Sequence, residues 1–464
     1  MTEASADARP TTTAEAPFVP LRKMLRGGLL RDPLQTLIDA ADEHPGKVVQ
    51  LSLGTVRAFL VSEPRHVQHV LRDNAKNYTR AGDNMLYKSV RKLSGEGIFS
   101  EGEVWEASRR RMQPHFTAKR IDSYIEPMSR AVNAALDDLA IPAEGATLDA
   151  GSTTSRIICQ TMTTVFFGGK IPLSDAMTII ENQEVVANTL RYRLLVPFYP
   201  NALPFPGDFA FARAVKNIDA VVYPLIRKER ANPSGDPDAL STLATAVDAD
   251  GNLLPERQVR DDIVSIFATT TETTYNLLAW LWPVLEAHPA IAARMQEEID
   301  SVVRAGEPIT QEQLGRLRYS KMVMDELVRL YPSGWLIPRT SVEDDVIDGV
   351  HIPAGSHIAL SPVTTHRLRA YWDRPNEFDP ERFAPEQPKR QHRYAYYPFG
   401  GGGHQCIGMY LFGIEAPLVA AAILARYRVK MTEPGIPDYK LAASLRPNKR
   451  IYMTVTPAQQ PVGA

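Results

Sequence analysis

The sequence predicts a mainly α-helical protein with a small β region. Apolar residues recur at helical spacing over long stretches, the longest from Pro255 to about Ala287 and another from Met409 to Tyr427. Shorter stretches alternate between apolar and polar residues, as in 47–61, or have strand-like patterns, as in 346–360. The 464 residues are 44% hydrophobic and 23% charged, which is typical of a globular protein with a large core. Length alone would suggest two or three domains.

The composition argues against several classes of protein. Two cysteines, Cys159 and Cys406, are too few for a disulfide framework and fit a reducing compartment. No apolar run approaches the roughly 20 residues of a membrane span, and residues 1–17 have neither the apolar core nor the basic start of a signal peptide. The net charge of −2 gives no reason to expect nucleic acid. We therefore expect a cytoplasmic protein without a membrane anchor or a nucleic-acid partner.

The N-terminal part combines a tail, a helix and a hairpin. Residues 1–18, rich in Ala, Thr, Glu and Pro, predict a disordered tail. Asp32-Pro33 predicts a helix start, because Asp is a favoured cap and Pro suits the first turn. The stretch 47–61 turns at Gly54-Thr55, which indicates a β-hairpin. The glycine-punctuated segment 74–102 is irregular, and long loops of this kind are often functional lids.

Several charged or hydroxylated side chains stand out along the middle of the chain. Trp105 and Arg109 are four residues apart on a predicted helix and so share one face. Glu326 and Arg329 are three apart on another helix, where they can form an ion pair. Each such pair is more often explained by packing or by a solvated surface. The segment 171–208 is apolar and interrupted by prolines, which fits either a greasy substrate or core packing.

The predicted helix 255–287 breaks a local rule. It contains five threonines around one acid, in the run Ala268-Thr-Thr-Thr-Glu-Thr-Thr274. Threonine is a poor helix former, and such departures are expected at functional sites. Its hydroxyls can also bond back to the backbone and bend the helix.

A glycine-rich loop carries the clearest chemical signal. Residues 399–408 read Phe-Gly-Gly-Gly-Gly-His-Gln-Cys-Ile-Gly, and an apolar helical run follows. Cys406 therefore lies at a helix N-terminus, where the helix dipole favours a thiolate. Glycines let the backbone approach a flat body closely, so the loop suits axial haem ligation. A lone Cys is usually a small buried side chain. No Lys-Ser/Thr follows as in a phosphate loop, and two distant cysteines do not make a zinc site.

The spacing Phe-x-x-Gly-x-x-x-Cys-x-Gly resembles the haem-binding loop of the cytochrome P450 superfamily. Four further family motifs occur in order: the Trp105/Arg109 pair, Glu272-Thr273, the Glu326/Arg329 pair and Pro380-Glu-Arg-Phe383. The resemblance covers nearly the whole chain. It implies a cytochrome P450 fold, a single triangular-prism haem domain over residues 19–464.

The resemblance also implies roles for individual residues. Cys406 is the axial ligand of haem b (iron protoporphyrin IX), and Glu272 and Thr273 deliver protons to bound oxygen. The remaining cofactor-binding residues are Trp105, Arg109, Thr269, Arg339, Phe399, His404 and Gly408. The expected substrate pocket comprises Leu86, Tyr87, Ser265, Ala268, Gly334, Leu336 and Ser444. Glu326, Arg329 and Arg382 form a structural charge network.

The implied activity is that of a haem-thiolate monooxygenase. It inserts one oxygen atom from O2 into an apolar small molecule, by hydroxylation or epoxidation, in secondary metabolism. Electrons come from NAD(P)H through a separate ferredoxin or flavodoxin with its reductase. The family usually has small residues where Thr269 and Thr270 stand, which leaves room for oxidative coupling, desaturation or ring formation. Peroxide-driven oxidation is a further alternative, and a haem-binding sensor or carrier is an alternative of another class.

Overall fold

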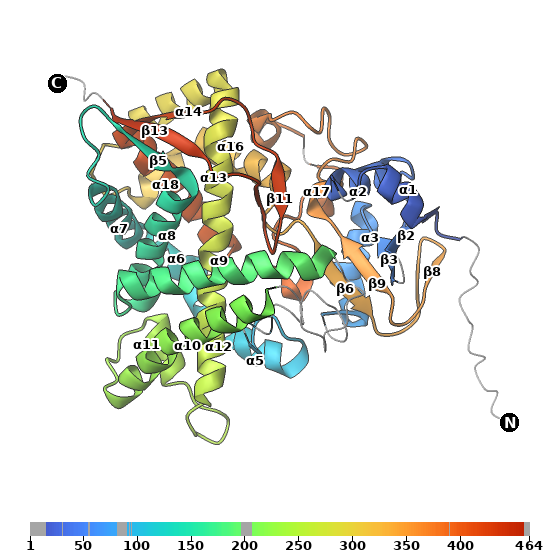
Figure 1. The fold of residues 1–464 in the computed structure, drawn as a ribbon, viewed down its shortest axis with the longest axis horizontal. Coiled ribbons are helices and arrows are strands. Elements are labelled where there is room, and N and C mark those ends of the chain that lie inside the picture. The colour runs from blue at the N-terminus through green and yellow to red at the C-terminus, as the bar shows by residue number, and fades with distance from the viewer. Residues whose placement is uncertain are drawn as a thin grey trace. The chain divides into compact units, whose positions relative to one another are not determined.

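The computed structural model describes residues 15–29, 31–53, 56–80, 91, 93, 95–195, 207–388 and 390–458. These residues form a helix-rich fold with small sheets, as the sequence predicts (Figure 1). The chain divides into two compact units. The first comprises residues 1–84, 335–376 and 389–405, and the second comprises 85–334, 377–388 and 406–464. Each unit is described by itself below.

The first unit is built on a six-stranded mixed sheet. Its strand order is β1 (Phe18–Val19), β2 (Val49–Leu53), β3 (Val56–Leu60), β9 (His357–Leu360), β6 (Ile337–Ser341) and β4 (Tyr78–Thr79). The predicted hairpin is present, because β2 and β3 pair antiparallel with Leu53 opposite Val56. Phe18, the last residue of the predicted tail, lies in β1 and pairs with Gln50. Residues 1–14 lie outside the described residues, so the tail stays a prediction.

Short helices and a second hairpin complete the first unit. The helices are α1 (Leu21–Arg26), α2 (Pro33–Asp42), α3 (Pro64–Gln68), the π-helix His69–Asp73 and α17 (Pro362–Thr365). Three-residue 3-10 turns lie at 75–77, 393–395 and 402–404. Strands β7 (Asp345–Ile347) and β8 (Val350–Ile352) pair with each other. The predicted cap of α2 is present, since the Asp32 carboxylate accepts a hydrogen bond of 2.9 Å from the Gln35 backbone N–H.

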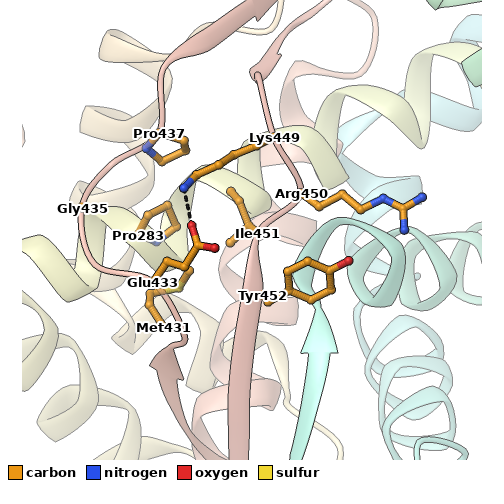
Figure 2. Close-up of a pocket in the computed structure, with 9 residues that line it drawn as sticks. All are labelled: Pro283, Met431, Glu433, Gly435, Pro437, Lys449, Arg450, Ile451 and Tyr452. Carbon is orange, nitrogen blue, oxygen red and sulfur yellow. Dashed lines mark hydrogen bonds and ion pairs between the residues drawn. The ribbon is translucent and has the colours of Figure 1, made fainter.

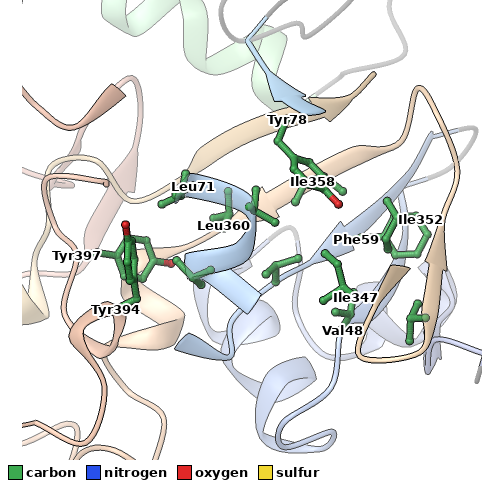
Figure 3. Packing of buried hydrophobic residues seen from close by; sticks show 14 residues of the cluster. Val48, Phe59, Leu71, Tyr78, Ile347, Ile352, Ile358, Leu360, Tyr394 and Tyr397 are labelled. Carbon is green, nitrogen blue, oxygen red and sulfur yellow. The ribbon is translucent and has the colours of Figure 1, made fainter. Parts of the chain in front are cut away.

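Apolar side chains from the sheet and these helices form one core of the first unit (Figure 3). Alternate residues of β3 and β9, such as Phe59, Ile358 and Leu360, point into it. Tyr394 and Tyr397, which precede the glycine-rich loop, are buried in the same cluster. The loop is therefore tied to the core of the sheet through its preceding residues.

The second unit contains the long helices. They are α5 (Gly102–Met112), α6 (Ala118–Asp122), α7 (Ile125–Asp137), α8 (Ala150–Phe167), α9 (Leu173–Leu195), α10 (Asp208–Ala231), α11 (Ala239–Ala244), α12 (Glu256–Thr270), α13 (Glu272–Ala287), α14 (Pro289–Val302), α15 (Gln311–Arg316), α16 (Arg318–Leu330) and α18 (Met409–Arg426). Short 3-10 turns lie at 113–116 and 380–383. Helices α9 and α10 pack side by side, and both contact α12 (Figure 1).

Two small sheets belong to the second unit. Strands β10 (Tyr427–Met431), β13 (Tyr452–Pro457) and β5 (Ala146–Asp149) form one, with β13 in the middle. Strands β11 (Tyr439–Leu441) and β12 (Leu445–Pro447) form an antiparallel hairpin, in which Lys440 lies opposite Arg446. We refer to residues 439–447 as the C-terminal hairpin.

The predicted long helix 255–287 is wrong in one respect, because the structure divides it at Thr271. Helix α12 ends at Thr270 and α13 begins at Glu272. The hydroxyls of Thr269 and Thr270 donate to the carbonyl oxygens of Ser265 and Ile266, each at 2.7 Å. Thr271 donates to Phe267 O at 2.5 Å. Such back-bonding competes with the helical ladder and bends helices, so the threonine run accounts for the break.

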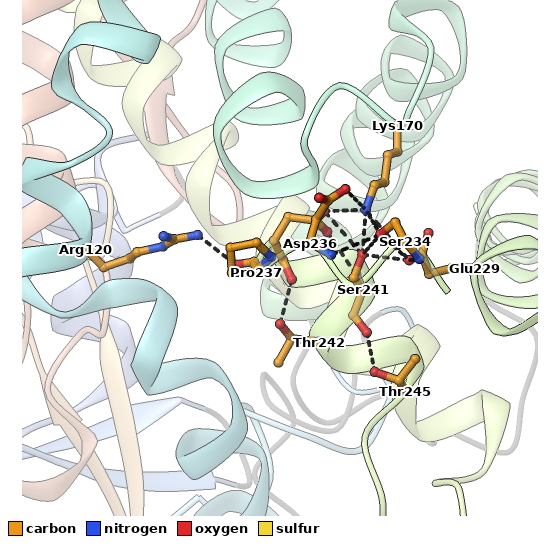
Figure 4. Close-up of polar contacts among 10 residues, drawn as sticks. Arg120, Lys170, Glu229, Ser234, Asp236, Pro237, Ser241, Thr242 and Thr245 are labelled. Atoms are coloured by element: carbon orange, nitrogen blue, oxygen red, sulfur yellow. Dashed lines mark hydrogen bonds and ion pairs between the residues drawn. The ribbon is translucent and has the colours of Figure 1, made fainter. Parts of the chain in front are cut away.

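A lysine cluster anchors the start of α9 to the end of α10 (Figure 4). Lys170, just before α9, donates to Asp238 and Ser241, each at 2.5 Å, and to Ser234 at 2.6 Å. Burial alone would raise the pKa of Glu229, but hydrogen bonds from Ser234 and Ser241 lower it to about 2. The cluster therefore fixes the N-terminal end of α9 and the C-terminal end of α10. Segment 196–206, which lies between the other two ends of these helices in the sequence, is outside the described residues.

Candidate haem and oxygen site

The predicted site residues are distributed over both units. Arg339, Leu336, Phe399 and His404 belong to the first unit. The second unit contains Trp105, Arg109, Ser265, Ala268, Thr269, Glu272, Thr273, Glu326, Arg329, Gly334, Arg382, Cys406, Gly408 and Ser444. Leu86 and Tyr87 lie outside the described residues.

The two cysteines have opposite environments. Cys159 is fully buried in α8, and burial raises the pKa of its thiol to about 12. Cys406 is exposed and lies three residues before α18, an 18-residue helix. A Cβ atom at Gly408 would stand 3.9 Å from Cys406 Sγ, so glycine keeps that side of the sulfur open. Of the two thiols, only Cys406 is accessible to a ligand and placed where a helix N-terminus favours the thiolate.

Helix α5 brings a cation near this sulfur. Burial lowers the pKa of the Arg109 guanidinium, whereas the charge of Cys406 acts on it in the opposite direction, so the two groups are within electrostatic reach. Trp105 and Arg109 are both partly exposed, whereas Ser108 and Met112, which flank them on α5, are buried. The predicted pair therefore shares one accessible face of α5, where an indole N–H and a guanidinium can serve as donors to a carboxylate.

A buried carboxylate that the sequence did not single out fixes α5 against α12. Asp262 is fully buried and accepts hydrogen bonds from Arg111 at 2.7 and 2.8 Å and from Ser108 Oγ at 2.5 Å. Burial raises the pKa of Asp262, and the Arg111 charge opposes that shift. Because Ser108 and Arg111 flank Arg109, this contact sets the position of the α5 face.

The break between α12 and α13 carries an accessible stripe, formed by Ala268, Thr269, Glu272 and Thr273. These residues are partly exposed, whereas Thr270, Thr271 and Thr274 are buried. The stripe residues lie one turn apart, so they share one face. The predicted catalytic pair, Glu272 and Thr273, thus lies on the same accessible face as Thr269, while Ser265 is buried one turn earlier.

The glycine-rich loop of the first unit has little free space. Gly400 and Gly402 adopt φ of +68° and +66°, which favours glycine. A Cβ atom at Gly401 would lie 2.5 Å from the Tyr394 ring, and one at Gly402 would lie 1.8 Å from the Leu71 carbonyl oxygen. His404 is partly exposed at the end of this loop, whereas Arg339 on β6 is 3% exposed and donates to Pro338 O at 2.9 Å.

The structural charge network brings together the three residues that the motifs suggested. Arg329 donates to the Glu326 carboxylate at 2.6 and 2.8 Å, and both side chains are fully buried. Arg382 approaches Glu326 to 3.4 Å, and the Asp379 backbone N–H donates to it at 2.9 Å. One carboxylate therefore compensates two guanidiniums and holds segment 377–383 against α16.

These residues fit a haem group. The thiol that would ligate iron is exposed at a helix N-terminus, cationic Arg109 is within electrostatic reach of it, and Gly408 lies beside the sulfur. The second unit also has a separate hollow, shown in Figure 2. Its lining residues are Pro283, Met431, Glu433, Gly435, Pro437, Lys449, Arg450, Ile451 and Tyr452. None of the predicted site residues lines that hollow, so it is not the site described above.

Known proteins resemble this chain over nearly its whole length. The sequence profile of the cytochrome P450 family matches residues 16–455. Cyclooctat-9-en-7-ol 5-monooxygenase of Streptomyces melanosporofaciens is 32% identical, over 91% of this chain and 90% of the relative. Pentalenene oxygenase of Streptomyces avermitilis is 27% identical, over 93% of this chain and 95% of the relative. The crystal structure of the cytochrome P450DA heme domain superposes with a TM-score of 0.80 at 21% identity, covering 96% of this chain and 97% of that one.

Proposed function

The chain belongs to the cytochrome P450 family and is a monooxygenase of that family, and on this premise we propose that it oxidises an apolar terpene by hydroxylation or epoxidation. The proposal is carried by one observation: relatives named for the oxygenation of cyclooctat-9-en-7-ol and of pentalenene align over nine-tenths of this chain. A hydrocarbon substrate also agrees with the methyl group of Ala268 on the accessible stripe. The biological setting is secondary metabolism.

The haem-thiolate cofactor of the family, when bound, supplies the oxygen-activating redox chemistry. In this chain Cys406 would hold the iron, and the family resemblance implies that Phe399 would lie by the sulfur. Trp105 and Arg109 would donate to one propionate, and Arg339 and His404 would donate to the other. The closeness of Arg109 to Cys406 supports the assignment of the first pair.

Glu272 and Thr273 are proposed to hold and move protons on the accessible stripe. The Thr273 hydroxyl donates to Thr269 O at 2.8 Å, which leaves its oxygen able to accept a hydrogen bond from a group on the stripe. The Glu272 carboxylate lies at the first residue of α13. In this pair the Glu272 carboxylate would take a proton from solvent, and the Thr273 hydroxyl would orient that proton.

Electrons are proposed to come from NAD(P)H through a separate ferredoxin or flavodoxin, in the cytoplasm. One described helical segment, residues 402–426, is long and apolar enough to cross a membrane, but 61% of its apolar window is buried within the protein, as in the core helix of a soluble protein. In the basic stretch 388–393, the Arg390 guanidinium lies 4.6 Å from the centre of the Tyr396 ring and 5.7 Å from that of Trp372. These cation–π contacts support a role of Arg390 in packing.

The test is a binding screen followed by identification of products. Purified ferric protein is titrated with cyclic terpenes, fatty acids and aromatic acids, and displacement of the iron-bound solvent is read from the Soret band. Ligands that bind are then incubated with ferredoxin, its reductase, NADPH and labelled O2. We expect a terpene product that carries one labelled oxygen atom. Binding confined to fatty or aromatic acids, or a product without the label, contradicts the proposal and favours desaturation, coupling or ring formation.

Thr273→Ala tests the proton role in the same assay. We expect product per NADPH consumed to fall, because the hydroxyl beside Glu272 is lost while substrate binding is retained. Thr274→Val is the matched control, since its hydroxyl donates to the Glu415 carboxylate and it is buried off the stripe. Unchanged product per NADPH in Thr273→Ala would exclude the role.

A further inference from the structure

The C-terminal hairpin contacts the proposed proton pair directly. Ser444 Oγ donates to Glu272 Oε1 at 2.6 Å, and Arg446 Nη2 donates to the same oxygen at 2.5 Å. Asn276, one turn further along α13, donates to Ser444 Oγ at 3.1 Å. The family resemblance implies a place for Ser444 in the substrate pocket, and in the structure its hydroxyl donates to Glu272 and accepts from Asn276.

A backbone link extends the contact to Thr273. The Leu445 backbone N–H donates to Ser333 O at 3.1 Å, and Ser333 Oγ donates to Thr273 O at 3.1 Å. Residues 444–446 therefore hold both members of the pair. They contact the side chain of Glu272 directly and reach the backbone carbonyl of Thr273 through Ser333. The first turn of α13 has little freedom to rotate while the hairpin is in place.

Burial makes the Glu272–Arg446 pair more than a surface contact. The side chains are 15% and 8% exposed, respectively, so both charges have lost most of their water. Burial lowers the pKa of Arg446, but the charges of Glu272, Tyr275 and Glu184 outweigh it and raise that pKa. Arg446 is therefore a permanent cation. Buried ion pairs are weak contributors to stability compared with apolar packing, so stability alone is a poor explanation for placing one at the acid of the stripe.

Arg446 also forms an ion pair with a carboxylate of α9. Its Nη1 lies 3.9 Å from the carboxylate of Glu184, which is 57% exposed. The charged and titratable groups that interact with Glu272 in the described part of the chain are thus Arg446 on β12, Tyr275 on α13 and, through Arg446, Glu184 on α9. Only Arg446 among these groups is a cation, so the electrostatic hold on Glu272 depends on it.

We propose that Arg446 is a positioning residue for Glu272: it keeps the carboxylate in one orientation at the start of α13 and thereby sets how efficiently the Glu272–Thr273 pair works. The inference rests on the proposed proton role of that pair. It assigns to the C-terminal hairpin a task in turnover, in addition to any contact with substrate.

The experiment compares Arg446→Gln and Arg446→Lys with the wild-type holoenzyme. In Arg446→Gln we expect product per NADPH and kcat to fall about tenfold or more, as for a misplaced catalytic group, with little change in KM. The loss is expected in kcat because the carboxylate without its guanidinium partner no longer keeps one orientation at the start of α13. Arg446→Lys should restore part of the rate, because lysine keeps the positive charge but lacks the planar guanidinium with its several donors.

A second measurement, on the substrate-free holoenzyme, does not depend on turnover. The infrared carboxylate bands of Glu272, isolated by subtracting the Glu272→Gln spectrum, should shift in Arg446→Gln relative to wild type, because the carboxylate loses its guanidinium partner. This result separates the two proposals. If no terpene is converted, the proposed substrate class fails, but the infrared comparison still tests Arg446.

Two controls limit the interpretation. Lys449→Gln removes a cation three residues away that pairs with Glu433 (Figure 2) and should leave product per NADPH unchanged. Glu184→Gln removes the second carboxylate near Arg446 and should also leave it unchanged. An Arg446→Gln enzyme with wild-type product per NADPH and wild-type carboxylate bands of Glu272 overturns the proposal, as does an equal loss in Glu184→Gln.

Discussion

Glu415 offers a test of buried electrostatics in the helix that follows Cys406. Its side chain is fully buried in α18, its Oε2 accepts a hydrogen bond of 2.9 Å from Thr274, and its Oε1 has no partner among the described residues. Burial raises the pKa of Glu415 to about 8, and the bond from Thr274 only partly opposes that shift. At neutral pH the carboxyl group is therefore protonated in the folded protein and ionised in the unfolded chain.

The sign and size of the effect follow from proton linkage. Between the ordinary pKa of 4.5 and the folded value of about 8, the folded state binds one proton more than the unfolded state. The contribution of Glu415 to the free energy of unfolding is thus complete below the ordinary pKa and is lost as pH rises. The loss approaches about 1.4 kcal/mol per pH unit and totals about 5 kcal/mol over this window.

The perturbation is Glu415→Gln, which keeps the shape of the neutral carboxyl group and removes its titration. The free energy of unfolding is measured by urea titration in steps across this window, up to about pH 8. We expect the mutant to gain stability relative to wild type as pH rises, by about 1.4 kcal/mol per unit at the steepest point. Glu433→Gln is the control, because its exposed carboxylate has a pKa lowered by Lys449 and so alters stability only at acid pH. Parallel curves for Glu415→Gln and wild type would refute the reasoning.

Three other substitutions test the site and its support. Cys406→Ser should abolish the absorption band of the thiolate-ligated, reduced carbon-monoxide complex, and an unchanged band excludes Cys406 as the ligand. Glu326→Gln leaves Arg329 fully buried without its counter-charge. This change should lower the free energy of unfolding by about 3–5 kcal/mol. A loss below about 1 kcal/mol in urea unfolding contradicts a structural role for the network. Gly402→Ala forces a side chain into φ +66° with its Cβ 1.8 Å from the Leu71 carbonyl oxygen, so it should lower the unfolding midpoint and the haem content, whereas wild-type values for both would show that the loop relaxes freely.

Local features of the fold could be predicted because they depend on neighbours in sequence. The Asp32 cap, the β2–β3 hairpin and the helix after Cys406 all follow from patterns of a few residues. The threonine run also predicted that hydroxyls could bend the helix, and the structure has its break at Thr271. The same local patterns did not predict that the bend would be a full break between two helices. The break depends both on the hydrogen bonds of the threonine hydroxyls to the backbone and on the burial of Thr270 and Thr271.

Partners that are distant in sequence could not be predicted. Asp262 gave no signal, because it follows other charged residues such as Arg260 and Asp261. Its role depends on Arg111, 151 residues away. Glu415 had a weak signal, a lone acid within an apolar helix, but Thr274 lies 141 residues from it. Ser444 was expected in the pocket, and only the folded hairpin shows that it contacts Glu272, 172 residues away.

The sequence by itself determined the family, the cysteine at a helix start and the acid–threonine pair, because spacing along one helix or loop decides which side chains share a face. The tertiary structure decided which of these side chains are buried, which remain accessible and which charge each one meets. The physical reason is that desolvation and ion pairing depend on all the elements that pack around a group. Thus Cys159 and Cys406 are both thiols in or next to apolar helical runs of the sequence. In the structure, burial raises the pKa of Cys159 to about 12, whereas Cys406 stays exposed and accessible to a ligand.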